Sequence, residues 1–200
     1  MSISFTTVLA VGSFLLSIYT LWATQLRRGR LKMTQPALVC LRRELPANTP
    51  KIFMRTLLFA TAVKGRVVEN MFLRVQQPMG TYVFDFWGYG ESEKLTLGSG
   101  LFVGQTGVAY NHHFNPRLGS VDFLFAAGEY RIEVFATAVG EKRAEKLMEL
   151  SFTVGGEQAA ELLQIMDREL WLLWNADMRS YDGHIERRPR RPNRPQEITR

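Results

Sequence analysis

The first 26 residues form an almost uninterrupted apolar stretch. No charged side chain occurs between Ser2 and Leu26, and most positions there are aliphatic or aromatic. About 24 residues of helix, rising ~1.5 Å each, reach ~36 Å, which exceeds the ~30 Å hydrocarbon core of a bilayer. Tyr19 and Trp22 lie near the C-terminal end of the stretch, where amphipathic rings favour the headgroup region. The pattern predicts a single transmembrane anchor over residues 1–26.

Basic residues follow the apolar stretch at once. Arg27, Arg28, Arg30 and Lys32 lie in a juxtamembrane linker, residues 27–36, and no Lys or Arg precedes the anchor. By the positive-inside rule this charge distribution places the rest of the chain in the cytoplasm, and these four side chains are expected to attract anionic lipid headgroups. A cleaved secretory signal has basic residues before a shorter apolar core, so we interpret the segment as a retained anchor in the cell membrane.

Alternation of apolar and polar positions dominates residues 37–155. It is clearest over residues 130–138 and 148–154, where every second side chain is apolar. The same pattern predicts strands at 37–44, 52–60, 67–75, 81–87 and 121–126, with 108–114 as an eighth. Short strands separated by turn residues, without alternating helices, are typical of an all-β sandwich. We therefore predict a sandwich of seven or eight antiparallel strands.

Residues 125–134, with the sequence FAAGEYRIEV, resemble one corner of immunoglobulin-like and fibronectin type III-like sandwiches. In those domains a glycine turn precedes a tyrosine that opens the penultimate strand, and its hydroxyl bonds back to nearby backbone. Gly128 and Tyr130 match that pattern, whereas Ala126 stands where those domains often carry Asp. Cys40 is the one cysteine of the chain, so the disulfide of antibody domains is absent. The resemblance implies a fold and no activity.

The pattern changes after residue 155. Apolar residues recur at steps of three and four over residues 157–175, which predicts an amphipathic helix within a segment 156–178 that packs on the domain or on a partner. Trp171 and Trp174 belong to its apolar face and are candidate protein contacts. Residues 179–200 are rich in arginine and proline, and we predict a disordered basic tail.

The net charge of +6 does not indicate a nucleic-acid-binding surface. Residues 27–32 carry four positive charges, residues 184–200 carry a further excess of four, and residues 33–183 are therefore near −2. A nucleic-acid-binding fold presents its basic residues on the folded surface. We expect no nucleic-acid partner.

Two features invite a catalytic or metal-binding interpretation. His112 and His113 are adjacent, and adjacent residues of a strand point to opposite faces, so both can bind one metal only within a loop. No further ligand stands at metal-site spacing, so we predict a turn with two neutral imidazoles and no metal. The glycines of residues 88–107 lack dinucleotide or P-loop spacing and are interpreted as loop glycines.

These observations favour a non-enzymatic, membrane-tethered domain that binds another protein and needs no cofactor. The candidate contact surfaces are the glycine-rich loop 88–107 and the helix 157–175. The alternative is a small-molecule or glycan-binding domain on the outer side of the membrane, using Trp87, Tyr89, His112 and His113. Trp87 and Tyr89 lie near the end of the aromatic strand 81–87, where side chains are more accessible.

Overall fold

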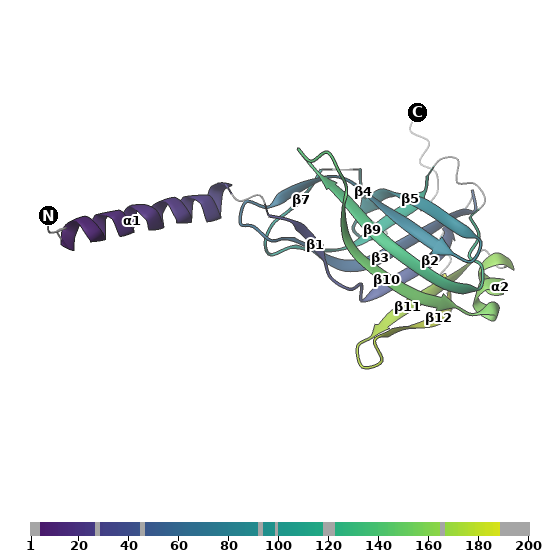
Figure 1. Ribbon diagram of the computed structural model, residues 1–200. Coiled ribbons are helices and arrows are strands. Elements are labelled where there is room, and N and C mark those ends of the chain that lie inside the picture. Colours follow the sequence, from purple (N-terminus) through teal and green to yellow (C-terminus); the bar gives the residue numbers. More distant parts are fainter. Residues whose placement is uncertain are drawn as a thin grey trace, which may run out of the picture.

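A computed structural model describes residues 5–26, 29–44, 47–91, 94–98, 100–117, 123–164 and 167–188 (Figure 1). An N-terminal helix projects from one end of a β domain. The helix comprises α1 (Phe5–Leu21) and a π-helical turn, η1 (Trp22–Leu26).

The helix has the properties of a membrane span. No residue of α1 is buried, and among the described residues it is the one helix long and apolar enough to cross a bilayer, with a mean hydropathy of 1.6 over Phe5–Thr24. Its hydroxyl groups bond to carbonyls one turn earlier, from Ser17 (2.9 Å), Thr20 (2.8 Å) and Thr24 (2.7 Å). These bonds satisfy the hydroxyls in a lipid environment. Length and composition suit a membrane span and equally a signal sequence.

The β domain is one sheet in which all strand pairs are antiparallel. In the described part of the chain it has 12 strands. They are β1 (Leu31–Met33), β2 (Leu38–Glu44), β3 (Thr49–Ala60), β4 (Arg66–Gln77), β5 (Gly80–Tyr89), β6 (Thr96–Leu97), β7 (Leu101–Val103), β8 (Val108–Pro116), β9 (Gly128–Ala138), β10 (Glu145–Val154), β11 (Arg168–Asn175) and β12 (Ser180–Arg187). The all-β prediction is confirmed, with more strands than the alternation indicated.

The sheet curls until it is nearly barrel-like. Its strand order is β10-β9-β4-β5-β8-β3-β2-β11-β12, and the short strands β1, β6 and β7 pair with β3, β5 and β4. β10 and β12 end this order, yet they lie near each other because the sheet closes on itself (Figure 1). β1 lies beside the first part of β10, where Arg30 and Glu145 form an ion pair at 3.6 Å.

Alternation along the long strands fills the interior. Met71, Leu73 and Val75 of β4 and Ile132 and Val134 of β9 are fully buried. Each such side chain contributes about 1.5–3 kcal/mol when it leaves water. The strand predicted at 121–126 is not observed over residues 123–126, which are irregular, and residues 121 and 122 lie outside the described part. Aromatic rings of this segment nevertheless add to the core. Three rings meet there edge-on, those of Phe84, Phe123 and Phe125.

The hydrogen bond expected from Tyr130 to nearby backbone is present. The hydroxyl of Tyr130 donates to the carbonyl oxygen of Ala126 at 2.8 Å. Gly128 before it has φ +132°, and a Cβ there would lie 2.5 Å from Pro78. This position therefore requires glycine.

The prediction of a helix over 157–175 is wrong for its second half. The helix α2 (Gly156–Gln164) ends after nine residues, and β11 follows. In β11 the buried residues Leu170 and Leu172 are two positions apart, and the strand pairs with β2. The apolar residues of 168–175 fit both the helical period of 3.6 and the strand period of two. Hydrogen bonding to the edge of β2 makes this segment a strand.

The prediction of a disordered tail over 179–200 is also wrong for its first part. Ser180–Arg187 forms β12, which pairs with β11 along its whole length. Tyr181 and Ile185 alternate with polar residues and pack against the core. Residues 189–200 lie outside the described part of the chain.

Candidate functional site

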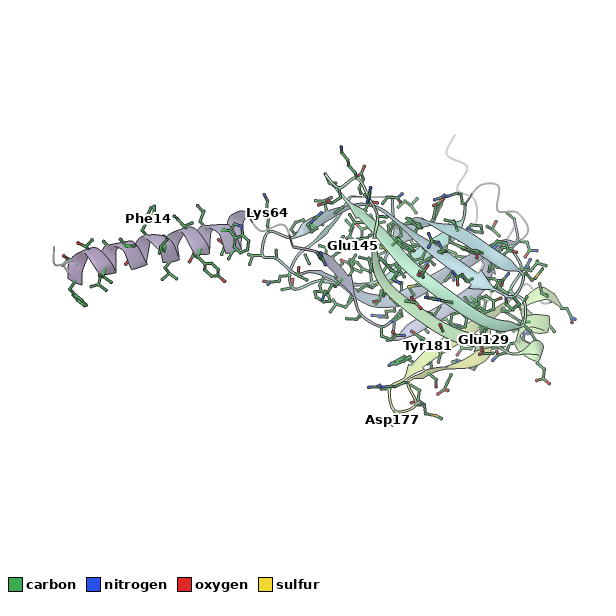
Figure 2. All side chains as sticks on the ribbon, in the orientation of Figure 1. Phe14, Lys64, Glu129, Glu145, Asp177 and Tyr181 are labelled. Atoms are coloured by element: carbon green, nitrogen blue, oxygen red, sulfur yellow. The ribbon has the colours of Figure 1, made fainter. Side chains whose placement is uncertain are left out.

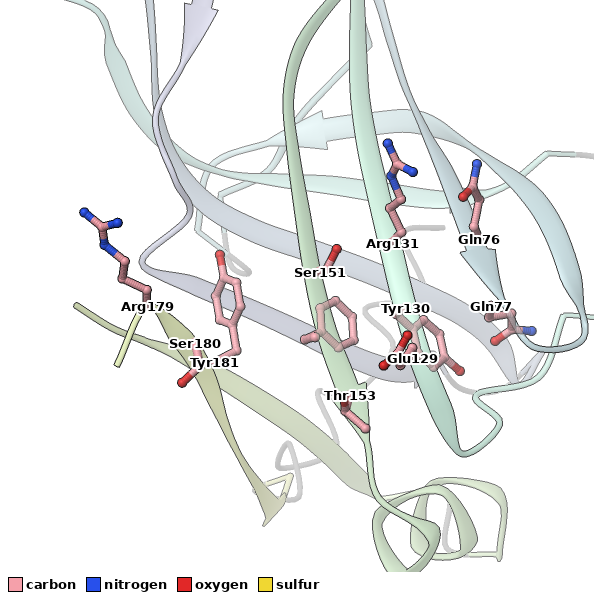
Figure 3. A pocket seen from close by; sticks show the side chains of 11 residues that line it. Gln76, Gln77, Glu129, Tyr130, Arg131, Ser151, Thr153, Arg179, Ser180 and Tyr181 are labelled. Atoms are coloured by element: carbon pink, nitrogen blue, oxygen red, sulfur yellow. The ribbon is translucent and has the colours of Figure 1, made fainter. Parts of the chain in front are cut away.

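A groove of about 580 Å³ separates the two end strands of the sheet. One wall comes from β10, with Ser151 and Thr153, and the other from the start of β12, with Ser180 and Tyr181 (Figure 3). Within the described residues β10 pairs with β9 alone and β12 with β11 alone. Edge strands of this kind present unpaired backbone N–H and C=O groups. The groove is therefore a gap in the sheet bordered by two strand edges.

Tyr181 holds the β12 wall in place. Its hydroxyl donates to the carbonyl oxygen of Pro36 and accepts from the amide of Gln35, both at 2.9 Å. Its ring meets Phe152 of β10 edge-on at 6.3 Å. Burial raises the pKa of Tyr181 to about 12, against the opposing effect of the Gln35 hydrogen bond. The tyrosine is thus a neutral, fixed element of the wall.

Polar side chains line most of the groove. Glu129 and Arg131 of β9 line it together with Arg179 from the turn before β12. Arg131 is already engaged by Glu149 at 2.6 Å, while Arg179 lies exposed at the groove margin. Because Glu149 offsets Arg131, the remaining charges of Arg179 and Glu129 leave the groove close to neutral. The lining therefore suits a polar ligand.

Gln77 lines the groove and is 8% exposed. Within the described residues neither atom of its side-chain amide has a hydrogen-bond partner. Leaving a buried polar group unpaired costs about 1–3 kcal/mol. Both atoms are buried, so in this conformation the amide lies behind the surface of the groove and a ligand does not reach it.

His112 and His113 lie on β8 and not in a turn, and both are fully buried. They point to opposite faces of the sheet. His112 lies beside Phe86 at 6.1 Å, whereas the ring of His113 stacks on Phe53 at 5.1 Å and its Nε2 lies 3.2 Å from the carbonyl oxygen of Gly90. Burial lowers the pKa of each to about 4, so both are neutral near pH 7. Among the described residues no three His, Cys, Asp or Glu side chains gather as metal ligands.

The aromatic candidates do not form one surface. Trp87 is 47% exposed, whereas Tyr89 packs against the core beside Phe86. Trp171 contacts Phe53 edge-on at 5.7 Å, and Trp174 contacts Tyr181 at 5.1 Å. Both tryptophans are on β11: Trp171 packs the β11–β12 hairpin against β3, and Trp174 packs β11 against β12 within the hairpin.

The glycine-rich segment 88–107 is likewise more structured than predicted. In its described part, β6 pairs with β5 at Gly88 and Tyr89, and β7 pairs with the start of β4. Among the basic candidates, Arg30 and Lys32 are exposed, and Arg27 and Arg28 lie outside the described residues.

A buried ionic cluster lies on the outer face of β2, β3 and β11. Glu169 accepts from Arg188 at 2.7 Å and from Arg42 at 3.4 Å, and Lys51 donates to Glu44 at 2.7 Å. Arg42, Lys51 and Glu169 are each less than 9% exposed. The cluster ties the end of β12 to the sheet.

The sequence did not indicate the groove residues, because they come from four distant segments and most are ordinary surface types. The alternation of residues 180–187 was the one signal that predicts a strand at this edge. Comparison with known proteins finds no matching family model, no matching curated protein and no matching solved structure.

Proposed function

We propose that this chain is a non-enzymatic, membrane-tethered domain that binds an extended segment of another protein in the groove between β10 and β12. The observation that carries the proposal is the gap bordered by two strand edges and lined mostly by polar side chains. An added strand would supply backbone hydrogen bonds to one of these edges. The polar lining favours a segment with polar side chains.

The tether is the N-terminal helix, retained in the membrane with the domain on the cytoplasmic side. The length of Phe5–Thr24 and the basic residues Arg30 and Lys32 support this arrangement. Membership of the immunoglobulin-like class is part of the same proposal. The bond from Tyr130 to Ala126 supports it.

Site-specific photo-crosslinking tests the groove in the full-length membrane protein. A photoreactive residue replaces Ser151 or Thr153, and the matched control replaces Ala109, an exposed strand position on β8 outside the groove. We expect one protein partner to crosslink at both groove positions and not at the control. Equal crosslinking at Ala109 would refute the groove as the binding site.

Gln77→Leu separates binding from folding. Removing an unpaired buried amide should leave the free energy of unfolding unchanged or raise it. Because the amide is not accessible from the groove, the same variant should leave crosslinking at Ser151 unchanged. Reduced crosslinking in the folded variant would instead show that the amide of Gln77 turns into the groove when the segment binds.

A further inference from the structure

Hydrogen bonds hold one end of the β domain to residues 29 and 30, which follow the N-terminal helix. The amide of Arg30 donates to the hydroxyl of Thr61 at 2.8 Å, and the amide of Thr61 donates to the carbonyl oxygen of Arg30 at 2.9 Å. Arg66 also donates to the carbonyl oxygen of Gly29 at 2.7 Å. Two residues separate η1 from Gly29, and an extended chain covers at most ~3.6 Å per residue, so Gly29 lies within about 11 Å of Leu26. The turn between β3 and β4 is therefore held close to the end of the helix.

Apolar side chains are exposed at this end of the domain. Phe102 of β7 pairs with Val67 of β4, and the amide of Val139 donates to the carbonyl oxygen of Val67 from the other side. Phe102 is 59% exposed, Val139 60%, and Val63 in the β3–β4 turn 64%. These residues lie on neighbouring segments and leave an apolar strip in contact with water.

Basic side chains surround the strip. Lys64 lies in the β3–β4 turn next to the helix junction (Figure 2), and Lys142 and Arg143 lie in the turn between β9 and β10. All three are exposed. Segments 29–32, 61–66 and 139–145 together hold six basic and two acidic residues, although residues 33–183 as a whole are near −2. Positive charge is thus concentrated at the end of the domain that adjoins the helix.

We propose that this anchor-side rim, formed by Val63, Lys64, Phe102, Val139, Lys142 and Arg143, rests on the anionic surface of the membrane that the helix spans. The inference depends on the proposed tether and goes beyond it, because it gives the β domain its own lipid contact. Apolar side chains between basic ones match the interface, where the former enter the acyl boundary and the latter lie near phosphates.

Docking of the rim would orient the groove. Glu145, at the start of β10, pairs with Arg30 near the rim, and Ser151 in the groove lies six residues further along the strand. At about 3.3 Å per residue this separation is about 20 Å. The groove is then held clear of the lipid and accessible to a partner in the aqueous phase.

Lipid contact is measured with a fluorophore in the full-length protein, reconstituted in nanodiscs of equal parts phosphatidylcholine and phosphatidylglycerol that contain nitroxide-labelled lipid. The dye is attached at Val139→Cys on the rim or, as the control, at Asp177→Cys in the distant turn between β11 and β12. Cys40 is fully buried, so the introduced thiol is the one labelled. We expect quenching by the nitroxide at position 139 and not at position 177.

Charge variants complete the test. Replacing Lys64, Lys142 and Arg143 by Gln removes three charges, which should lower the ratio of docked to undocked domain about 100-fold and abolish quenching at position 139. Equal quenching at positions 139 and 177, or quenching that persists in the triple variant, would overturn the rim contact. Release of the full chain from membranes by alkaline carbonate would instead refute the tether, so the two failures are distinguishable.

Discussion

Acid should destabilise this domain through His112 and His113. Both imidazoles are fully buried on β8, and burial lowers the pKa of each to about 4, compared with an ordinary value of 6.5. Above pH 6.5 both the native and the unfolded chain hold neutral imidazoles, so the full stability is present. Between pH 6.5 and about 4 the unfolded chain takes up protons that the native chain does not. The free energy of unfolding therefore falls as the pH falls through this window.

The size of the effect follows from the two pKa values. For one histidine titrating at 6.5 when unfolded and near 4 when native, lowering the pH from 7 to 5 removes about 2 kcal/mol. The pair removes about 4 kcal/mol, a large part of the 5–15 kcal/mol typical of a domain. Carboxylates such as Glu149 take up protons at lower pH than this window, because the hydrogen bond from Arg131 lowers the pKa of Glu149.

Denaturant unfolding of the full-length protein in detergent, followed by tryptophan fluorescence at pH 7, 6 and 5, measures this loss. His112→Leu replaces a buried titrating ring by an apolar side chain of similar size, so about 2 kcal/mol of pH-dependent loss should remain. His184→Leu, on the exposed strand β12, is the matched control and should retain the loss of the unmodified protein. If His112→Leu loses as much stability between pH 7 and 5 as the unmodified protein, the buried imidazole is not the cause.

Three further predictions concern single contacts and topology. Tyr130→Phe should lower the free energy of unfolding by about 1–2 kcal/mol, because the carbonyl of Ala126 loses its donor. Thermal denaturation measures this loss, and an unchanged stability would show that the hydrogen bond from Tyr130 does not stabilise the domain. Glu169→Gln should cost about 3 kcal/mol because Arg42 and Arg188 lose the buried carboxylate that they share, although Arg42 keeps Glu44. Glu145→Gln removes the exposed ion pair with Arg30 and should cost less than about 0.5 kcal/mol. A C-terminal reporter active in one compartment should report the cytoplasm, and an exported reporter or a shortened mature chain would contradict the anchor orientation.

Much of the β domain could be predicted from alternation because its strands bury one face. In β4 from Met71 onward and in β9 from Tyr130 onward every second residue enters the core, and the predicted strands 67–75 and 130–138 lie within the observed ones. The hydrogen bond of Tyr130 was equally accessible, since it joins residues four positions apart in the chain. The short strands β1, β6 and β7 carry too few residues for a period of two to appear.

The candidate site was not predictable in the same way. Gln77, Ser151 and Tyr181 are separated by most of the domain, and none belongs to a chemical motif. His112 and His113 were predicted in a turn, although their neighbours also formed the pattern of a strand. Their burial depends on the segments that pair with and cover β8, including Gly90.

By itself the sequence determined the apolar helix, the all-β class and the separation of basic ends from a near-neutral middle, because each depends on composition or on a local period. Tertiary structure decided the rest. Residues 168–175 satisfy both helical and strand periodicity, and pairing with β2 made them β11. The pairing of β11 with β2 places β12 at one end of the strand order and β10 at the other. The groove exists because the sheet curls and brings these two end strands close together.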